Sequence, residues 1–278
     1  PKRSCPRTRS GGRIASVLEC VINISEGRRR AIVDAIADAA GRDLLDVHSC
    51  PFHNRSVLTV VGVDAPRSIA RATVELLDLQ THDGVHPRIG VLDVVPFVAL
   101  DGSSDTDALE ARDAFADWIV AELAVPVFLY GPERTLPEVR RSAFTDLLPD
   151  IGGPLPHRTA GAVAVGVRPV LVAWNLWLDT DDLDQARSVA RTLRGPGVRA
   201  LGLRVGDQVQ VSCNLIDPDR VGPAEVWDLV APLAPIARAE LVGLVPTSVL
   251  QATSPSRWEL LDLAPDRTIE ERLRRRGA

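Results

Sequence analysis

Short apolar runs alternate with amphipathic segments along nearly the whole chain, and this alternation restricts the fold more than any other feature of the sequence. The apolar runs are bounded by Gly, Pro and polar residues, which is typical of buried strands. The segments between them repeat apolar residues at helical spacing. Strands and helices that interleave in this way predict an α/β protein with mixed sheets.

The expected strands are residues 17–24, 44–47, 57–63, 91–100, 125–130, two runs within 162–178, 198–204, 208–215 and 239–244. The expected helices are residues 28–40, 66–79, 106–123, 136–147, 180–193, 223–234 and 256–273. Thr180 is expected to cap its helix, with two Asp residues in the first turn. The pair Gly206-Asp207 predicts a hairpin between the two strands that flank it.

The stretch at 151–161 is rich in Gly and Pro and is the best single domain boundary. We therefore expect a flexible basic tail at 1–16, an N-terminal subdomain at 17–161 and a C-terminal subdomain at 162–278. No internal repeat of fixed period is visible in the sequence.

Composition and charge disfavour several functional classes. The hydrophobic fraction of 45% and the charged fraction of 25% are those of a soluble globular protein. The net charge is −5 although five basic residues lie within the segment 1–13, so the remaining body is still more acidic and does not suit nucleic acid. No apolar run is long enough to cross a membrane. There is no secretory signal and no CxxC pair, which favours the cytosol with reduced cysteines.

The segment 81–90 is the densest in candidate functional groups, because it carries His82, His86, an Asp and Arg88 between a helix and an apolar strand. The two histidines have the i, i+4 spacing of metal ligands, but a Gly and a Pro break any helix here and no third ligand is obvious, so no metal is expected. A general base fits better, since Arg88 would disfavour the charged form of a neighbouring histidine. The alternative is a loop histidine that satisfies backbone groups.

Three further segments carry polar side chains. The run His53-Asn54-Arg55-Ser56 precedes a strand, after a segment containing His48, and fits an anion or an amide-rich ligand; simple loop capping is the alternative. The Gly-rich segment 151–160 allows close approach of a flat ligand, or is a linker. One face of the strand 208–215 is polar and lines a cleft or faces solvent. Nucleotide-binding and serine-hydrolase motifs are missing from the sequence.

Several blocks together resemble the glutamate formiminotransferase domain family. They occur in order between about residues 17 and 273, and they read LECVINISEG at 18–27, HNRS at 53–56, THDGVHPRIG at 81–90, DVVPF at 93–97, VPVFLYG at 125–131, QVSCNL at 210–215 and ELVGLVP at 240–246. The chain departs from the family at Ile22, where Pro is usual, and at Thr159-Ala160, where some members have an aromatic residue. No cyclodeaminase segment follows, so the free-standing form is expected.

The resemblance implies two α/β subdomains whose mixed sheets face a central folate-binding cleft, with helices outside. It implies tetrahydrofolate as co-substrate and transfer of a formimino (or formyl) group in one-carbon metabolism and histidine degradation, without a metal. His86 would be the catalytic acid/base, and Pro87 would hold its backbone in place. The residues themselves, argued from the polar segments above, make His48, His53, Asn54, Arg55, His82, Arg88, Gln210, Ser212 and Asn214 the candidate substrate-binding residues. The implied folate loop is Ile151, Gly152, Gly153, Pro154, Leu155, Pro156, His157, Arg158, Thr159 and Ala160.

The chemistry of the implied substrates adds one expectation and leaves alternatives open. Glutamate carboxylates favour Arg partners, and Arg55, Arg88 and Arg158 are the candidates. Rival functions are a folate-independent formiminoglutamate hydrolase and a non-catalytic folate-binding protein. The sequence leaves open formimino against formyl, the direction of transfer, the preferred length of the glutamate tail, and the oligomeric state, for which a homodimer is one option.

Overall fold

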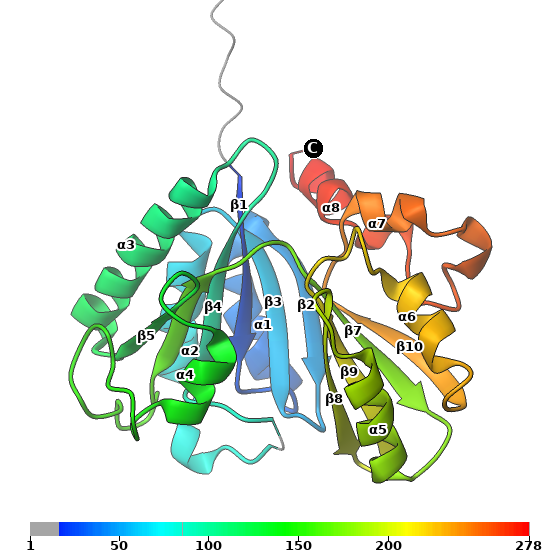
Figure 1. Ribbon diagram of the computed structural model, residues 1–278. Coiled ribbons are helices and arrows are strands. Elements are labelled where there is room, and N and C mark those ends of the chain that lie inside the picture. The colour runs from blue at the N-terminus through cyan, green and yellow to red at the C-terminus, as the bar shows by residue number, and fades with distance from the viewer. Residues whose placement is uncertain (1–16, 85, 278) are drawn as a thin grey trace, which may run out of the picture.

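The structure is a computed structural model that describes residues 17–84 and 86–277 (Figure 1). In this part of the chain the strands form a six-stranded sheet and a four-stranded sheet. The first sheet has the order β2-β3-β1-β4-β6-β5 and consists of β1 (Leu18–Ile24), β2 (Leu44–Cys50), β3 (Arg55–Val61), β4 (Leu92–Ala99), β5 (Val127–Tyr130) and β6 (Val163–Val167). The second has the order β10-β7-β9-β8 and consists of β7 (Val172–Leu178), β8 (Val198–Val205), β9 (Gln208–Leu215) and β10 (Ile236–Val242).

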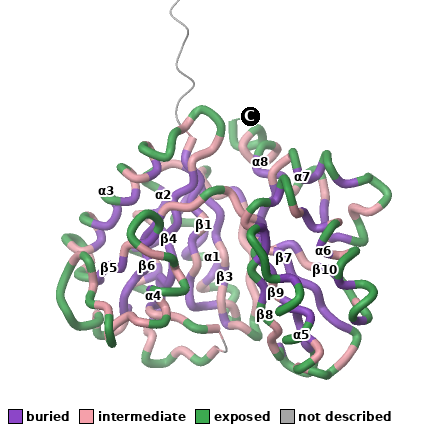
Figure 2. Tube along the Cα trace, in the orientation of Figure 1, coloured by how far each residue is buried: buried purple, intermediate pink, exposed green. Residues whose placement is uncertain are grey.

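Helices cover one face of each sheet, where the apolar cores lie. The helices are α1 (Arg30–Asp38), α2 (Ala65–Leu76), α3 (Asp105–Leu123), α4 (Leu136–Ser142), α5 (Leu183–Leu193), α6 (Pro223–Val230), α7 (Thr247–Ala252) and α8 (Ile269–Arg276). Apolar residues of α1, α2 and α3 share a core with the first sheet, and those of α5 and α6 share one with the second. Helix α4 packs through Val139 against β5 on the opposite face of the first sheet. Strands β1, β4 and β6 are largely buried, β2, β8 and β10 only partly, and the outer faces of the helices are exposed (Figure 2).

The α/β class predicted from the sequence is confirmed, with differences in detail. The first sheet is mixed, because β6 runs parallel to β4 and β5 while β1 is antiparallel to its neighbours. The second sheet was also expected to be mixed, but its pairings are antiparallel. The hairpin at Gly206-Asp207 is present, since Val205 pairs with Gln208.

Two helix predictions were wrong for identifiable reasons. Asp182 caps α5 in place of Thr180, because its carboxylate accepts from the backbone N–H groups of Asp184 and Gln185. The expected long helix at 256–273 is replaced by short 3₁₀ turns and by α8, which begins only at Ile269. Proline at the start of both 3₁₀ turns, at 255 and 265, breaks the helical hydrogen-bond pattern there.

The same arrangement of strands and helices occurs twice in the molecule. The elements β1-α1-β2-β3-α2-β4 form the strand order 2-3-1-4, and β7-α5-β8-β9-α6-β10 form the equivalent order in the second sheet. This is the split β-α-β arrangement. Strands β5 and β6 extend only the first copy. The sequence shows no repeat because the two copies share a topology while their residues differ.

The change from one sheet to the other falls between Val167 and Val172, because β6 lies inside the first sheet between β4 and β5. The expected boundary between 161 and 162 would have separated β6 from that sheet. The expected tail at 1–16 lies outside the described residues. Within them, no helix is long and apolar enough to cross a membrane.

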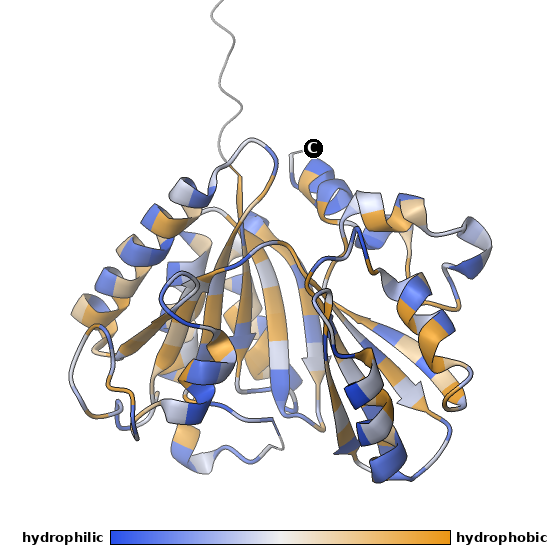
Figure 3. Cartoon of the chain, viewed as in Figure 1, coloured by the Kyte–Doolittle hydropathy of each residue, from blue (hydrophilic) through white to orange (hydrophobic). Residues whose placement is uncertain are grey.

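The two halves contact each other along β2 and its hairpin. The ring of Phe52, at the tip of the β2–β3 hairpin, packs against Gly206 at the tip of the β8–β9 hairpin. Helix α8 lies beside β2, where Ile269 joins a small core and Arg272 reaches Asp46 at 3.6 Å. Figure 1 shows the two sheets side by side with β2 next to the second sheet, and Figure 3 shows hydrophilic residues at the lower ends of β2 and β3.

Strand alternation leaves each sheet with a face turned away from its main helices. In the first sheet Cys20 and Ile22 point into the helical core. Asn23 therefore points to the opposite face, together with the residue that pairs with it on β3. In the second sheet Trp174 and Leu176 point into the core and Asn175 points away from it. These two outward faces meet at β2 and β10, as the contacts of the site show below.

Candidate active site

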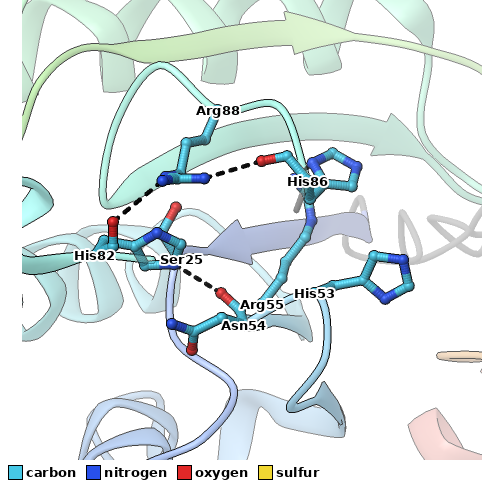
Figure 4. A pocket seen from close by; sticks show the side chains of 7 residues that line it. All are labelled: Ser25, His53, Asn54, Arg55, His82, His86 and Arg88. Carbon is cyan, nitrogen blue, oxygen red and sulfur yellow. Dashed lines mark hydrogen bonds between the residues drawn. The ribbon is translucent and has the colours of Figure 1, made fainter. Parts of the chain in front are cut away.

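A small pocket forms where the end of β1, the β2–β3 loop and the segment before β4 come together (Figure 4). Its lining residues are Ser25, His53, Asn54, Arg55, His82, His86 and Arg88. Six of these seven are residues that the sequence predicted for the site. The sheet brings them together because β1 lies between β3 and β4, so that both loops are at the same edge.

His86 lies against two guanidinium groups and one carboxylate. Its Nδ1 is 2.8 Å from Arg55 Nη1 and 3.4 Å from Arg140 Nη1. Both arginines also donate to Oδ2 of Asp93, at 2.8 Å from Arg55 and 2.6 Å from Arg140. Asp93 is buried in β4, and its other oxygen accepts from the backbone N–H of Ile89. Two positive groups therefore share one negative group, and the cluster keeps an excess of positive charge beside the imidazole.

The hydrogen bonds that the described residues make to the His86 ring all involve Nδ1. Pro87 O lies 2.7 Å from Nδ1, which requires a proton on that nitrogen, whereas Arg55 Nη1 requires a lone pair there. The two contacts belong to the two neutral tautomers of the ring and cannot be made together. Nε2 has no hydrogen bond to any residue in the described ranges 17–84 and 86–277.

The surroundings keep the pocket histidines neutral. Burial, followed by the charges of Arg55 and Arg140, lowers the pKa of His86 to about 2. Burial also lowers the pKa of His53 and of His82. Arg55 itself is buried, and this lowers its pKa to about 10 although Asp93 acts in the opposite direction. The expected suppression of the charged form is therefore present at His86, where burial is the main cause and Arg55 and Arg140 add to it, while the charge of Arg88 acts in the same direction at His82.

Arg88 braces the loop that carries His86. Its guanidinium donates to the backbone oxygens of His82 at 3.2 Å and His86 at 3.1 Å (Figure 4), and also to that of Gly84 at 2.9 Å. These bonds use most of the N–H donors of Arg88, and the three acceptors all lie within the segment 82–86. A role in binding substrate carboxylates was expected from the sequence and stays a prediction, while the observed contacts are those of a positioning residue.

Asn54 and His82 hold the two pocket loops against each other. Asn54 has a left-handed backbone (φ 47°), and its amide accepts from Gly27 N–H and donates to the carbonyl of Asp83. His82 Nε2 lies 2.9 Å from the carbonyl oxygen of Asn54, and no described residue binds its buried Nδ1. A Cβ on Gly84 would lie 2.6 Å from the carbonyl oxygen of His53, so the loops can approach this closely only with glycine there.

His53 and His48 extend the polar surface from this pocket toward the second sheet. The rings of His53 and His86 are edge to face, with centroids 6.3 Å apart. His53 Nδ1 also contacts Cys50 Sγ at 3.0 Å. His48 lies on β2, and its Nε2 is 3.8 Å from Oε1 of Glu240 on β10. This contact joins the outward faces of the two sheets.

Glu240 is the centre of a polar group on the second sheet. Its Oε2 accepts from Trp177 Nε1 at 2.9 Å, Asn175 Nδ2 at 3.1 Å and Gln210 Nε2 at 3.3 Å. Gln210, a candidate from the polar face of β9, is thus hydrogen-bonded to Glu240, and its role in binding substrate stays a prediction. Ser212 and Asn214 lie further along the same face of the strand, half-buried and exposed.

The segment 151–160 lies beside the pocket loop and does not line the pocket. Its carbonyls accept from the segment 79–91: Thr159 O from Leu79 N–H, and Ala160 O from Val91 N–H. His157 is turned inward, with Nδ1 accepting from the backbone of residues 159 and 160. Leu155 is 77% exposed. A folate-binding role for Ile151–Ala160 therefore stays a prediction.

Three residues of the site were missed by the reasoning from sequence. Asp93 and Glu240 were signalled weakly, since each is a lone carboxylate within an apolar strand. Arg140 carried no signal, because it is one of two adjacent arginines on a short helix and only the packing of α4 turns it toward His86.

Two further features of the site concern space and metals. Next to the pocket, on the other side of Asn54 and His82, lies an open hollow of about 350 Å³. Arg28, Arg29 and Asp83 line its rim. Residues 17–84 and 86–277 contain no group of three or more His, Cys, Asp or Glu side chains that could hold a metal ion.

Comparison with known proteins extends across the chain. Residues 17–168 match the family described as "Formiminotransferase domain, N-terminal subdomain". A glutamate formimidoyltransferase of Streptococcus pyogenes serotype M1 is 34% identical, over 85% of this chain and 91% of that protein. One of Thermoplasma acidophilum is 34% identical, over 84% of this chain and 90% of that protein. A formimidoyltransferase-cyclodeaminase of Sus scrofa is 33% identical over 85% of this chain, which spans about half (51%) of that relative.

Proposed function

The chain belongs to the formiminotransferase family, and from this premise we propose that it is a glutamate formimidoyltransferase that uses tetrahydrofolate as co-substrate. The observation that carries the proposal is the similarity to two glutamate formimidoyltransferases over about nine tenths of their lengths. The pocket supports it, since a neutral histidine with a free ring nitrogen lies among positive groups that suit anionic substrates.

His86 is the proposed acid/base of the transfer. In the reaction, N5 of tetrahydrofolate forms a bond to the formimino carbon, and the bond from that carbon to the glutamate nitrogen breaks. The N5 proton must leave, and the glutamate nitrogen must gain one. His86 Nε2 accepts the first proton and returns it to the glutamate nitrogen, so that no net proton is consumed. Pro87 O supports this sequence by accepting from Nδ1, which leaves the Nε2 lone pair free.

The charges around His86 also make its basicity depend on the substrates. A histidine with a pKa of about 2 is neutral but weakly basic. The carboxylates of bound glutamate or folate would offset the excess charge of Arg55 and Arg140 and so remove one cause of the lowered pKa of His86, while burial, the largest cause, remains. The charges of the bound substrates thus favour a more basic His86.

The proposed place for folate is along the outward faces of the two sheets, with the segment 151–160 at one end. This segment supports the proposal because its C-terminal end is hydrogen-bonded to residues on both sides of the His86 loop, Leu79 and Val91. Leu155 presents an exposed apolar side chain that a flat ring system could cover. Binding by Arg158 would follow from its charge, which suits the glutamate tail of folate.

A turnover assay tests the function. Purified protein is incubated with formiminoglutamate, with and without tetrahydrofolate, and glutamate release is followed. We expect release only when tetrahydrofolate is present. Release at the same rate without it would identify a hydrolase, and binding of tetrahydrofolate without any release would identify a folate-binding protein.

A further inference from the structure

The carboxylate of Glu240 is satisfied on one oxygen only. Oε2 accepts from Trp177, Asn175 and Gln210, three donors on its own sheet. The contact from Oε1 to His48 is 3.8 Å long, which is beyond a hydrogen bond. No residue in the described part of the chain donates a hydrogen bond to Oε1. With its side chain 21% exposed, Glu240 presents a fixed carboxylate oxygen that a ligand can reach.

A second acceptor beside Glu240 also has no partner. Gln210 is 1% exposed, and its Nε2 is used by Glu240 while its Oε1 is buried without a hydrogen bond among the described residues. A buried carbonyl oxygen without a donor is unfavourable. Two neighbouring acceptors that lack donors, one of them negatively charged, suit a ligand that is positively charged and rich in N–H groups.

Glu240 lies within electrostatic reach of the pocket histidines. Burial is the main cause of the lowered pKa of both His48 and His53, and the charge of Glu240 opposes that effect at both residues. The ring of His53 is in turn 6.3 Å from that of His86. The outward face of the second sheet therefore places the negative charge of Glu240 within electrostatic range of His53, whose ring in turn lies beside that of His86.

We propose that Glu240 Oε1, with Gln210, binds the cationic formimino group of the donor and thereby selects formimino over formyl. This inference rests on the function proposed above and specifies its donor. The formimino group is an amidine, which is protonated at neutral pH and carries planar N–H donors that pair with a carboxylate as a guanidinium does. A formyl group has the same shape, but it is neutral and presents an oxygen that the carboxylate repels.

The chemistry of transfer fits this placement. The protonated amidine carbon is more electrophilic than the neutral one, and the Glu240 carboxylate stabilises that protonated state. The terminal nitrogen held by Glu240 stays on the carbon throughout, since the bonds that change are those to N5 and to the glutamate nitrogen. Glu240 therefore exchanges no proton with the reacting nitrogens, which is the task assigned to His86.

The test compares two donors that differ only in this group, N-formimino-L-glutamate and N-formyl-L-glutamate. In wild-type protein with tetrahydrofolate, we expect the formyl compound to bind at least about tenfold more weakly, measured as its inhibition constant against the KM of the formimino donor. In Glu240→Gln, which keeps the shape of the side chain, the KM of the formimino donor should rise about tenfold while the inhibition constant of the formyl compound stays unchanged or falls. Glu259→Gln, on the exposed surface, is the matched control and should leave both values unchanged.

Each outcome bears on the inference. Equal affinity of wild-type protein for the two compounds is by itself enough to overturn the inference. An unchanged preference for the formimino donor in Glu240→Gln also overturns it. A parallel loss of affinity for both compounds shows that Glu240 only supports the structure. Glu240→Asp keeps the charge and should keep the preference, which separates charge from folding. Wild-type protein without tetrahydrofolate-dependent turnover would refute the proposed function, whereas turnover without a preference refutes only the role of Glu240.

Discussion

The balance of charges around His86 decides what this residue can do. Arg55 and Arg140 share the single carboxylate of Asp93, and the imidazole lies in the remaining positive field. His86 and Arg55 could be found from the sequence, because each stands in a polar run directly before an apolar strand. Arg140 could not, since it comes from a helix that is more than fifty residues further along the chain, and only the folded structure brings it there.

Replacing His86 removes the proposed proton carrier and little else. In His86→Asn we expect kcat to fall by about 10² to 10⁴-fold, the usual contribution of general acid–base catalysis, while the protein stays folded. Steady-state kinetics and circular dichroism measure the two effects. His82→Asn is the comparison and should show a milder loss, because His82 holds the loop through the carbonyl of Asn54. A fully active His86→Asn enzyme would remove His86 from the mechanism.

Protonation of His86 should also appear in the stability of the protein. Its pKa in the folded state, about 2, is below the ordinary 6.5, so between these values the unfolded chain binds a proton that the folded chain does not. The resulting stability is present above pH 6.5 and is lost as the pH falls toward 2. We expect the free energy of unfolding, measured with urea between about pH 4 and 5.5, to rise with pH less steeply in His86→Asn than in wild type. The two slopes should differ by about 1.4 kcal/mol per pH unit. Equal slopes would show that His86 is protonated in the folded protein.

Asp93 is the counter-ion on which the cluster depends. Asp93→Asn leaves two guanidinium groups without a buried negative partner, and we expect the free energy of unfolding to fall by about 3 to 5 kcal/mol. Asp228→Asn, which breaks a surface pair with Arg257, should cost about 0 to 1 kcal/mol. Chemical denaturation of both variants provides the comparison, and a similar small loss in each would mean that the cluster is solvated.

At the scale of helices and strands, periodicity located nearly every element but could not locate all of their ends. The strands β1, β4 and β9 agree with the predicted runs to within a residue or two, because their apolar residues are buried on a sheet. The prediction for the C-terminal region was wrong, because the segment 256–273 has helical composition but contains a proline that starts a new turn. The sequence also could not show that β6 inserts between β4 and β5, because strand order depends on packing between distant segments.

The contact between the two pocket loops predicts a steric effect at Gly84. Gly84→Ala would place its Cβ 2.6 Å from the backbone oxygen of His53, so one of the two loops must move and carry His53 or His86 with it. We expect kcat/KM to fall by at least about tenfold, because small displacements of catalytic groups have large effects on rate. Gly195→Ala is the control, since no atom lies within 4 Å of its added Cβ. Equal activity of the two variants would show that the loops are not held against each other.

At the scale of the whole molecule, the proposed site reaches from the pocket of the first half to the place where His48 and Glu240 bring the two sheets together. His86 and Arg55 come from the first copy and Arg140 from α4, in the segment that extends it, and the second copy supplies Glu240 with its three donors. In the proposed arrangement the positive groups Arg55 and Arg140 come from the first half and the carboxylate of Glu240 from the second, so a substrate with carboxylates at one end and a cationic group at the other would contact both halves. The sequence predicted that both halves contribute, from the polar face of β9, although not which residue of the second half is central.

The fate of the transferred carbon tests the central claim most directly. Formiminoglutamate labelled with ¹³C in the formimino group is incubated with the protein and tetrahydrofolate, and the labelled carbon is followed by NMR. We predict that the label moves to tetrahydrofolate, with its nitrogen still attached, as unlabelled glutamate is released. Label that is released as formamide, or that remains on glutamate while tetrahydrofolate is bound, would contradict the assignment of this protein as a folate-dependent formimidoyltransferase.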